Sequence, residues 1–123
     1  MTRRQEKLRA RLGEILAWLE ADYPTRWGGP IRLRLEAMPR ISRGVDAEVV
    51  LQEPPLIRVS RTLRRSDAIL ALLHEYSHLR VERRNASASR TWSDQHGEKF
   101  WIEYGRLEAG FFKRWPGSPA GRV

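Results

Sequence analysis

The stretch that most constrains the fold is the segment of residues 66–84, which is strongly apolar and contains neither proline nor glycine. Its apolar residues include Ala68, Ile69, Leu70, Leu72, Leu73, Leu79 and Val81. Asp67 suits the first turn of a helix, where the helix dipole favours a carboxylate, and Ser66 is a candidate N-cap. The segment therefore predicts a buried central helix over residues 66–83.

The same segment contains His74-Glu75-Tyr76-Ser77-His78, an H-E-x-x-H pattern. Residues four apart share one face of a helix, with Cβ atoms roughly 5–6 Å apart, so the two imidazoles can converge on one metal ion. Glu75 flanks that position and can take a proton from a water molecule held there. The pattern is typical of zinc hydrolases, usually peptidases, and predicts one Zn²⁺ per chain with Glu75 as the catalytic residue.

A catalytic zinc usually has three protein ligands and an open fourth position. The third histidine of the chain, His96, is the first choice for the missing ligand. Glu98 and Glu103 are alternative ligands, because some zinc peptidases use a glutamate. Asp94 is a further candidate, either as a ligand or as the group that orients a ligand histidine.

His96 begins a second helical pattern, predicted over residues 94–113. Phe100, Tyr104, Leu107 and Phe111 recur there at helical spacing. Ser93 or Asp94 is the expected cap. Gly97 would then lie inside the helix, at a cost of about 1 kcal/mol relative to alanine, and a close approach to the central helix would explain it. The small polar residues 84–93 predict a mobile loop that borders the cleft.

Four aromatic residues admit two interpretations. The hydroxyls of Tyr23, Tyr76 and Tyr104 could stabilise an oxyanion, but packed core tyrosines are the preferred interpretation. Trp92 is expected in the core rather than in a cleft wall.

The combination of His74-Glu75-x-x-His78 with His96-Gly97-x-x-Phe100 resembles the SprT-like metallopeptidase domain, the family of the Spartan and Wss-type proteases. The resemblance covers roughly residues 30–112. It implies that His74, His78 and His96 bind zinc, that Glu75 is the catalytic base, and that the substrate is protein associated with DNA. Two features depart from the family pattern: the chain lacks the cysteines of a C-terminal zinc ribbon, and Arg80 occupies a position where many zincins have an apolar residue.

Outside these motifs, the sequence predicts a helix over residues 2–22 and strands near residues 31–37, 45–51 and 56–60, with turn residues at 39–44. Leu8, Leu12, Ile15, Leu16 and Leu19 form one apolar stripe on the first helix, while the strands alternate apolar and polar residues. The second and third strands are expected to form a hairpin, with one strand at the sheet edge available to bind a peptide substrate.

The expected fold class is α+β, a minimal zincin-like fold. A small three-stranded, mostly antiparallel sheet packs with an N-terminal, a central and a C-terminal helix. With 123 residues, the chain predicts one domain over residues 1–115 and a disordered tail over 116–123. The absence of cysteine excludes disulfides and thiolate metal sites and fits the cytoplasm. No signal peptide and no apolar run of membrane-spanning length is expected.

The chain is strongly basic, with a net charge of +8 and an isoelectric point near 10.9. The excess is due to arginine, with 20 arginines against three lysines. A basic surface attracts polyanions, so DNA is a candidate partner, and association with the nucleoid would follow. A basic surface that only contacts solvent explains the charge equally well. The alternative function is therefore a nucleic-acid-binding module with a structural zinc and no proteolytic activity.

Overall fold

The computed structural model describes residues 1–27, 30–37, 46–82 and 97–117. The elements follow in the order α1 (Arg3–Asp22), β1 (Arg32–Glu36), β2 (Ala47–Val50), β3 (Leu56–Ser60), α2 (Arg65–Val81) and α4 (Glu98–Arg114), which confirms the α+β class. The predicted turn at 39–44, loop at 84–93 and residues Trp92 and His96 lie outside the described residues, as does most of the predicted tail.

Helix α1 forms as its apolar stripe predicts. Thr2 and Gln5 cap its first turn reciprocally: the Thr2 hydroxyl accepts from the Gln5 N–H, and the Gln5 side chain accepts from the Thr2 N–H. The five predicted apolar residues, Leu8, Leu12, Ile15, Leu16 and Leu19, are all buried. At the other end, the N–H of Tyr23 donates to the carbonyl of Leu19 and closes the last turn.

The sheet has the strand order β1-β3-β2, with β3 at its centre. The predicted hairpin of β2 and β3 is confirmed, because these strands pair antiparallel. Strands β1 and β3 pair in parallel, so the sheet is mixed rather than mostly antiparallel. Alternation of apolar and polar residues specifies which face of a strand is buried, but it carries no information about strand direction. On β3, Arg58 forms ion pairs with Glu36 of β1 and Glu48 of β2 and so links all three strands.

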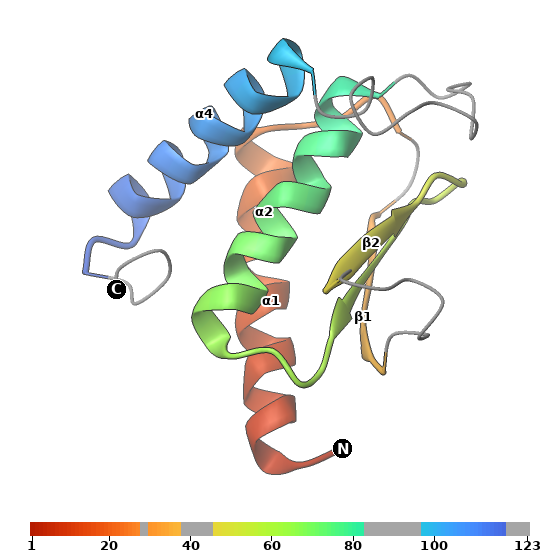
Figure 1. Cartoon of the computed structure of the whole chain (residues 1–123), viewed down its shortest axis with the longest axis vertical. Helices are drawn as coiled ribbons and strands as arrows, with labels where there is room; N and C mark the ends of the chain where they lie inside the picture. The colour runs from red at the N-terminus through yellow and green to blue at the C-terminus, as the bar shows by residue number, and fades with distance from the viewer. Residues whose placement is uncertain (28–29, 38–45, 83–96, 118–123) are drawn as a thin grey trace.

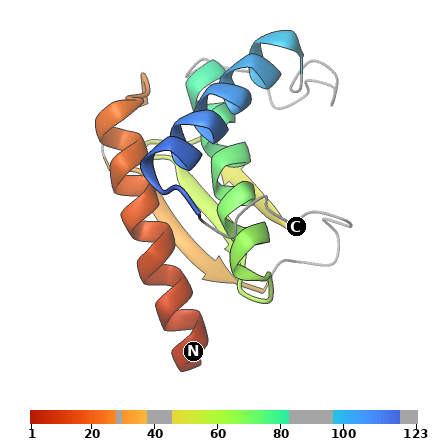
Figure 2. The same ribbon diagram turned by 90° about the vertical axis from the view of Figure 1, so that its left-hand side faces the viewer.

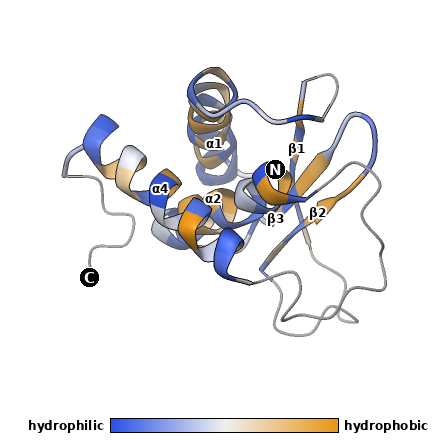
Figure 3. Ribbon diagram, turned by 90° about the horizontal axis from the view of Figure 1, so that it is seen from above, coloured by the Kyte–Doolittle hydropathy of each residue, from blue (hydrophilic) through white to orange (hydrophobic). Residues whose placement is uncertain are grey.

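Helix α2 lies at the centre of the protein, as expected. The sheet, α2 and α4 form successive layers, and α1 lies beside α2 and over β1 (Figures 1 and 3). Nine residues of α2 are buried, among them Leu72, Leu73, Tyr76 and Leu79. The predicted cap was wrong: Arg64 is the N-cap, and Ser66 lies inside the first turn. The helix begins one residue earlier than its apolar pattern suggested, because the carbonyl of Arg64 already accepts from the N–H of Ala68.

Helix α4 crosses α2 on the side away from the sheet (Figures 1 and 2). Phe100, Leu107 and Phe111 are its buried residues. Gly97 is the N-cap, in an extended conformation, so the prediction of a cap at Ser93 or Asp94 was wrong. Since Gly97 precedes the helix rather than interrupting it, the expected cost of a glycine inside the helix does not arise.

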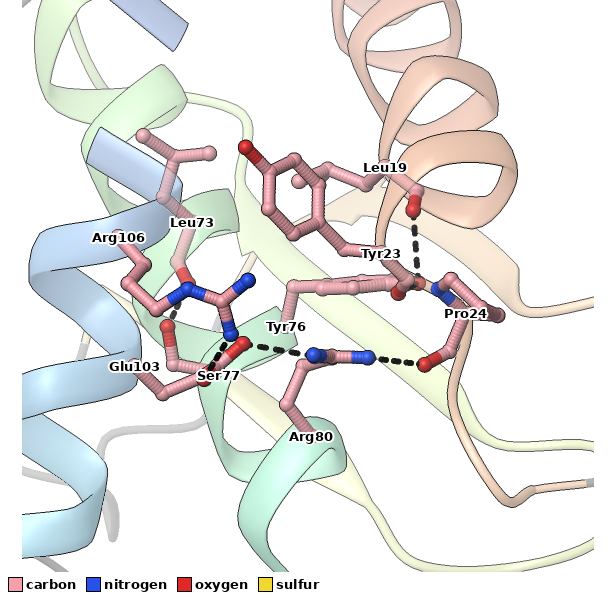
Figure 4. A network of polar contacts seen from close by, with 9 residues as sticks. All are labelled: Leu19, Tyr23, Pro24, Leu73, Tyr76, Ser77, Arg80, Glu103 and Arg106. Carbon is pink, nitrogen blue, oxygen red and sulfur yellow. Dashed lines mark hydrogen bonds and ion pairs between the residues drawn. The ribbon is translucent and has the colours of Figure 1, made fainter. Parts of the chain in front are cut away.

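A polar network holds α1 and α4 against α2 (Figure 4). The buried Tyr76 hydroxyl donates to the carbonyls of Leu19 and Tyr23 at the end of α1. Arg80 donates to the carbonyl of Pro24 and pairs with Glu103 of α4, with 2.7 Å between Nε and Oε1. Arg80 therefore replaces apolar packing at this position with contacts to two neighbouring segments. In the described part of the chain, no helix is long and apolar enough to cross a membrane.

Two glycines of α4, the exposed Gly105 and the half-buried Gly110, provide a test of how closely α4 packs against the end of α1. A methyl group at Gly110 would overlap the Tyr23 hydroxyl and lie 3.2 Å from its Cζ, whereas one at Gly105 would meet nothing within 4 Å. Alanine is favoured over glycine in a helix by up to about 1 kcal/mol at either position. We therefore expect Gly105→Ala to raise the free energy of unfolding and Gly110→Ala to lower it by about 1–3 kcal/mol in urea denaturation. Equal stabilisation by both changes would contradict this packing.

Candidate metal centre

The pattern on α2 brings three side chains together. His74, Glu75 and His78 each offer one potential ligand atom, and these atoms all lie within 4.8 Å of one another. The imidazole ring centres of His74 and His78 are 5.2 Å apart, as their positions one helical turn apart require. His78 and Glu75 are buried and His74 is half-buried, so the group lies near the protein surface and is reached by solvent mainly at His74.

Glu75 lies in a low-dielectric position between α2 and the sheet. Burial raises the pKa of its carboxyl group to about 8, and the nearby Glu48 carboxylate adds to the increase. A hydrogen bond from the backbone of Val49 acts in the opposite direction. A buried carboxylate with a raised pKa is a stronger base than an exposed one, and a neighbouring cation would favour its charged form.

The contact with Val49 shows which side of β2 faces the group. The backbone carbonyl of Asp46 accepts a hydrogen bond from the N–H of Ser60 at the end of β3. Because antiparallel pairs alternate between bonded and non-bonded, the pair of Val49 with Ile57 is a non-bonded one, and the N–H and carbonyl of Val49 point away from β3. The outward edge of β2, an edge strand of the sheet, therefore lies against Glu75.

Aromatic residues from the first turns of α4 form the opposite wall. The ring centre of Phe100 lies 4.8 Å from that of His74 and 4.4 Å from that of His78. Trp101 and Tyr104 lie 6.3 and 5.9 Å from His74. Trp101 remains 46% exposed, so it borders the group on its solvent side. The N-terminus of α4 is thus fixed beside the two histidines.

The predicted third ligand, His96, and the candidate Asp94 lie outside the described residues. His96 directly precedes Gly97, the N-cap of the helix whose first turns pack on His74 and His78. Glu98 and Glu103 are described, and neither belongs to the group of ligand atoms. The Glu103 carboxylate instead pairs with Arg80 and with Arg106, on the opposite face of α2.

The three candidate tyrosines lie in different surroundings. Tyr76 is a core residue whose hydroxyl donates to the end of α1, as the preferred interpretation expected. Tyr23 packs edge-on against Trp18, 5.4 Å between ring centres, on the same side of the protein as Tyr76. Tyr104 alone lies near the histidines, and burial and the Glu108 carboxylate raise its pKa to about 12.

Two parts of the site were not anticipated from the sequence. One is the backbone of Val49, whose role depends on how β2 pairs with β3. The identity of the side chain at this position does not predict that backbone contact. The other is Trp101, for which a signal existed: Phe100, Trp101 and Tyr104 form an aromatic set at i, i+1 and i+4 that begins four residues after the predicted third ligand.

The donor set fits a divalent transition metal ion. Two imidazoles one turn apart and an adjacent carboxylate are nitrogen and oxygen donors that such ions prefer, and the rings are already oriented by Phe100. Comparison of the chain with models of known protein families, with curated proteins and with solved structures finds no match. The site is therefore interpreted from its own geometry.

A metal ion bound here should stabilise the fold, because the ligands come together only in the folded chain. We expect a saturating divalent transition metal to raise the melting temperature by ~5 °C or more and EDTA to reverse the effect. His78→Ala should abolish the increase, while Asp67→Asn, which changes an exposed carboxylate on the same helix, should preserve it. A metal-induced increase of equal size in His78→Ala would contradict the assignment.

Proposed function

We propose that the protein is a zinc-dependent metalloendopeptidase of the SprT-like kind, with Glu75 as its general base. The observation that carries this proposal is the convergence of His74, Glu75 and His78 from one buried helix. A structural zinc site uses four closed ligands and needs no carboxylate in this position, whereas a hydrolytic site needs both an open coordination position and a base. The burial of Glu75 supports the second type of site.

Zinc is the metal that best suits this set. His74 and His78 would hold it, and His96 is the proposed third ligand because it immediately precedes the helix that packs on both. When bound, zinc supplies a Lewis acid that makes water nucleophilic near neutral pH and polarises the scissile carbonyl.

The residues of the chain supply the proton transfers. Glu75 accepts the proton of the attacking water and later donates it to the leaving amine, which requires a carboxyl group of raised basicity held next to the reacting atoms. The walls formed by β2 and by the aromatic residues of α4 limit the motion of this side chain and exclude solvent on two sides.

The edge of β2 supports a peptide substrate. The N–H of Val49 already bonds to Glu75, so the outward carbonyl of Val49 is the group that an added strand would bind there, in the mode of β-augmentation. A peptide paired with this edge would pass directly over Glu75. The exposed Trp101 on the other wall would then contact side chains of that peptide.

The substrate class follows from the resemblance and from the charge. A SprT-like peptidase would act on proteins associated with DNA, and a net charge of +8 favours contact with such a complex. The same charge favours the alternative function, a nucleic-acid-binding module in which zinc is structural and Glu75 has no chemical role.

Glu75→Gln distinguishes the two functions. The amide keeps the volume of the side chain but cannot accept the proton, so we expect zinc content to be unchanged and cleavage of labelled casein to fall by at least about 100-fold. Asp67→Asn is the matched control and should cleave at the wild-type rate. Assays are run with and without single-stranded DNA. If Glu75→Gln cleaves as fast as the wild type, the mechanism is contradicted. If the zinc-loaded wild type does not cleave at all, the alternative function is favoured.

The third ligand can be identified by comparing two variants. We expect about one zinc per chain in the wild type by plasma mass spectrometry. Removing one of three ligands typically weakens binding severely, so His96→Ala should lose the metal during dialysis against a weak chelator, whereas Glu98→Ala should retain it. Retention in His96→Ala with loss in Glu98→Ala would reverse the assignment.

A further inference from the structure

A second candidate site lies at the end of the molecule where α1 and α2 begin. A groove of about 530 Å³ is lined by Arg3, Arg4, Lys7, Leu8, Arg11 and Arg65. Five of these six residues carry a positive charge, and no carboxylate is among the described residues that line the groove. The first turns of both helices lie at this same end of the molecule in two perpendicular views (Figures 1 and 2).

The cations are arranged by helical geometry. Arg3, Lys7 and Arg11 are four residues apart, so they follow one face of α1 with a rise of about 6 Å between them. Arg65 is the first residue of α2 and lines the same groove. The N-cap of α2 makes no side-chain capping hydrogen bond, so the positive end of that helix dipole adds to the field of the side chains.

Two of the five cations are fixed by the fold and three are not. Arg4 donates to the carbonyl of Leu63, and Arg11 pairs with Glu14 and stacks over Trp115, 4.8 Å from the ring centre. Among the residues that the structure describes, Arg3, Lys7 and Arg65 form no ion pair. Fixed cations therefore form part of the wall, while three further cations are available to a ligand.

The charged side chains described in the lining of the groove are all cations. Other cations of the protein are balanced by acids: Arg58 pairs with Glu36 and Glu48, and Arg106 pairs with Glu103. Like charges around one concave volume repel each other, and a low-dielectric floor such as the buried Leu8 strengthens their field. A polyanion in the groove would relieve that repulsion.

We propose that this groove binds phosphate groups, either of a nucleic-acid backbone or of a free polyphosphate. Lysine and arginine side chains are the usual partners of phosphate oxygens, and binding releases counterions. The lining, as far as the structure describes it, offers no amide or carboxylate side chain that could read base edges, so we expect binding to be independent of sequence. A volume of about 530 Å³ accommodates a small polyphosphate or a few phosphates of a longer chain.

The groove is separate from the metal centre. Arg65 precedes His74 by nine residues of one continuous helix, a distance of about 14 Å along its axis. The inference therefore does not rest on the proposed function, and either can fail alone. If both hold, one face of the protein contacts the polyanion while the histidine group remains accessible at another part of α2.

The test uses matched double variants of the full chain. Arg3→Gln/Lys7→Gln removes two groove cations, and Arg9→Gln/Lys113→Gln removes the same charge from exposed positions outside the groove. Binding of a fluorescein-labelled 20-nucleotide single strand is followed by anisotropy at several salt concentrations. Inorganic tripolyphosphate is tested separately through its effect on the melting temperature. Circular dichroism checks that both variants are folded.

We expect the groove variant to bind the strand at least about tenfold more weakly than the wild type, and the control at most about threefold more weakly. The plot of log affinity against log salt has a negative slope, which should become less steep by about 1.4 for the groove variant because two phosphate contacts are lost. No strand binding, but stabilisation of the wild type by tripolyphosphate that the groove variant lacks, supports the site with a free polyphosphate as ligand. Equal losses in both variants, or no response to either probe, would overturn the proposal.

Discussion

The structure depends on the burial of α2. This helix is covered by the sheet, α1 and α4, yet it carries five polar or charged side chains on or near its buried surface: His74, Glu75, Ser77, His78 and Arg80. Burial of such groups is costly unless each finds a partner. On one face, Tyr76 and Arg80 bind the end of α1 and Glu103 of α4. On the other face, the two histidines and Glu75 are placed between β2 and the aromatic residues of α4.

Contacts on both faces of α2 fix the position of α4. The Arg80–Glu103 pair and the contact of the Phe100 ring with His78 both attach α4 to α2. The crossing of these helices is therefore fixed at two points, which places the N-terminus of α4 beside the group of His74, Glu75 and His78. Arg80 thus performs a structural task that an apolar side chain could not, because it binds the carbonyl of Pro24 after α1 and the carboxylate of Glu103 on α4 at once.

Charge is distributed unevenly along the same helix. At its N-terminus, α2 contributes Arg65 to a groove lined by cations, and in its second half it contributes the histidine–glutamate group. The two sites use different physics: the first depends on long-range, salt-sensitive attraction, and the second on short-range donor geometry in a partly buried position. A rigid helix keeps the distance between them constant, so a polyanion bound at one end would have a defined position relative to the other.

The sequence by itself determined the buried helix, the pairing of His74 with His78, the apolar stripe of α1 and the β2–β3 hairpin, because periodicity and residue type depend on local geometry. It did not determine the helix starts, where Arg64 and Gly97 replaced the expected caps, since ends depend on which backbone groups find partners. Only the tertiary structure decided that β1 runs parallel to β3, that the outward edge of β2 faces Glu75, and that Glu103 pairs with Arg80 rather than joining His74, Glu75 and His78. These features arise from contacts between segments far apart in the chain, for which the order of residues carries no signal.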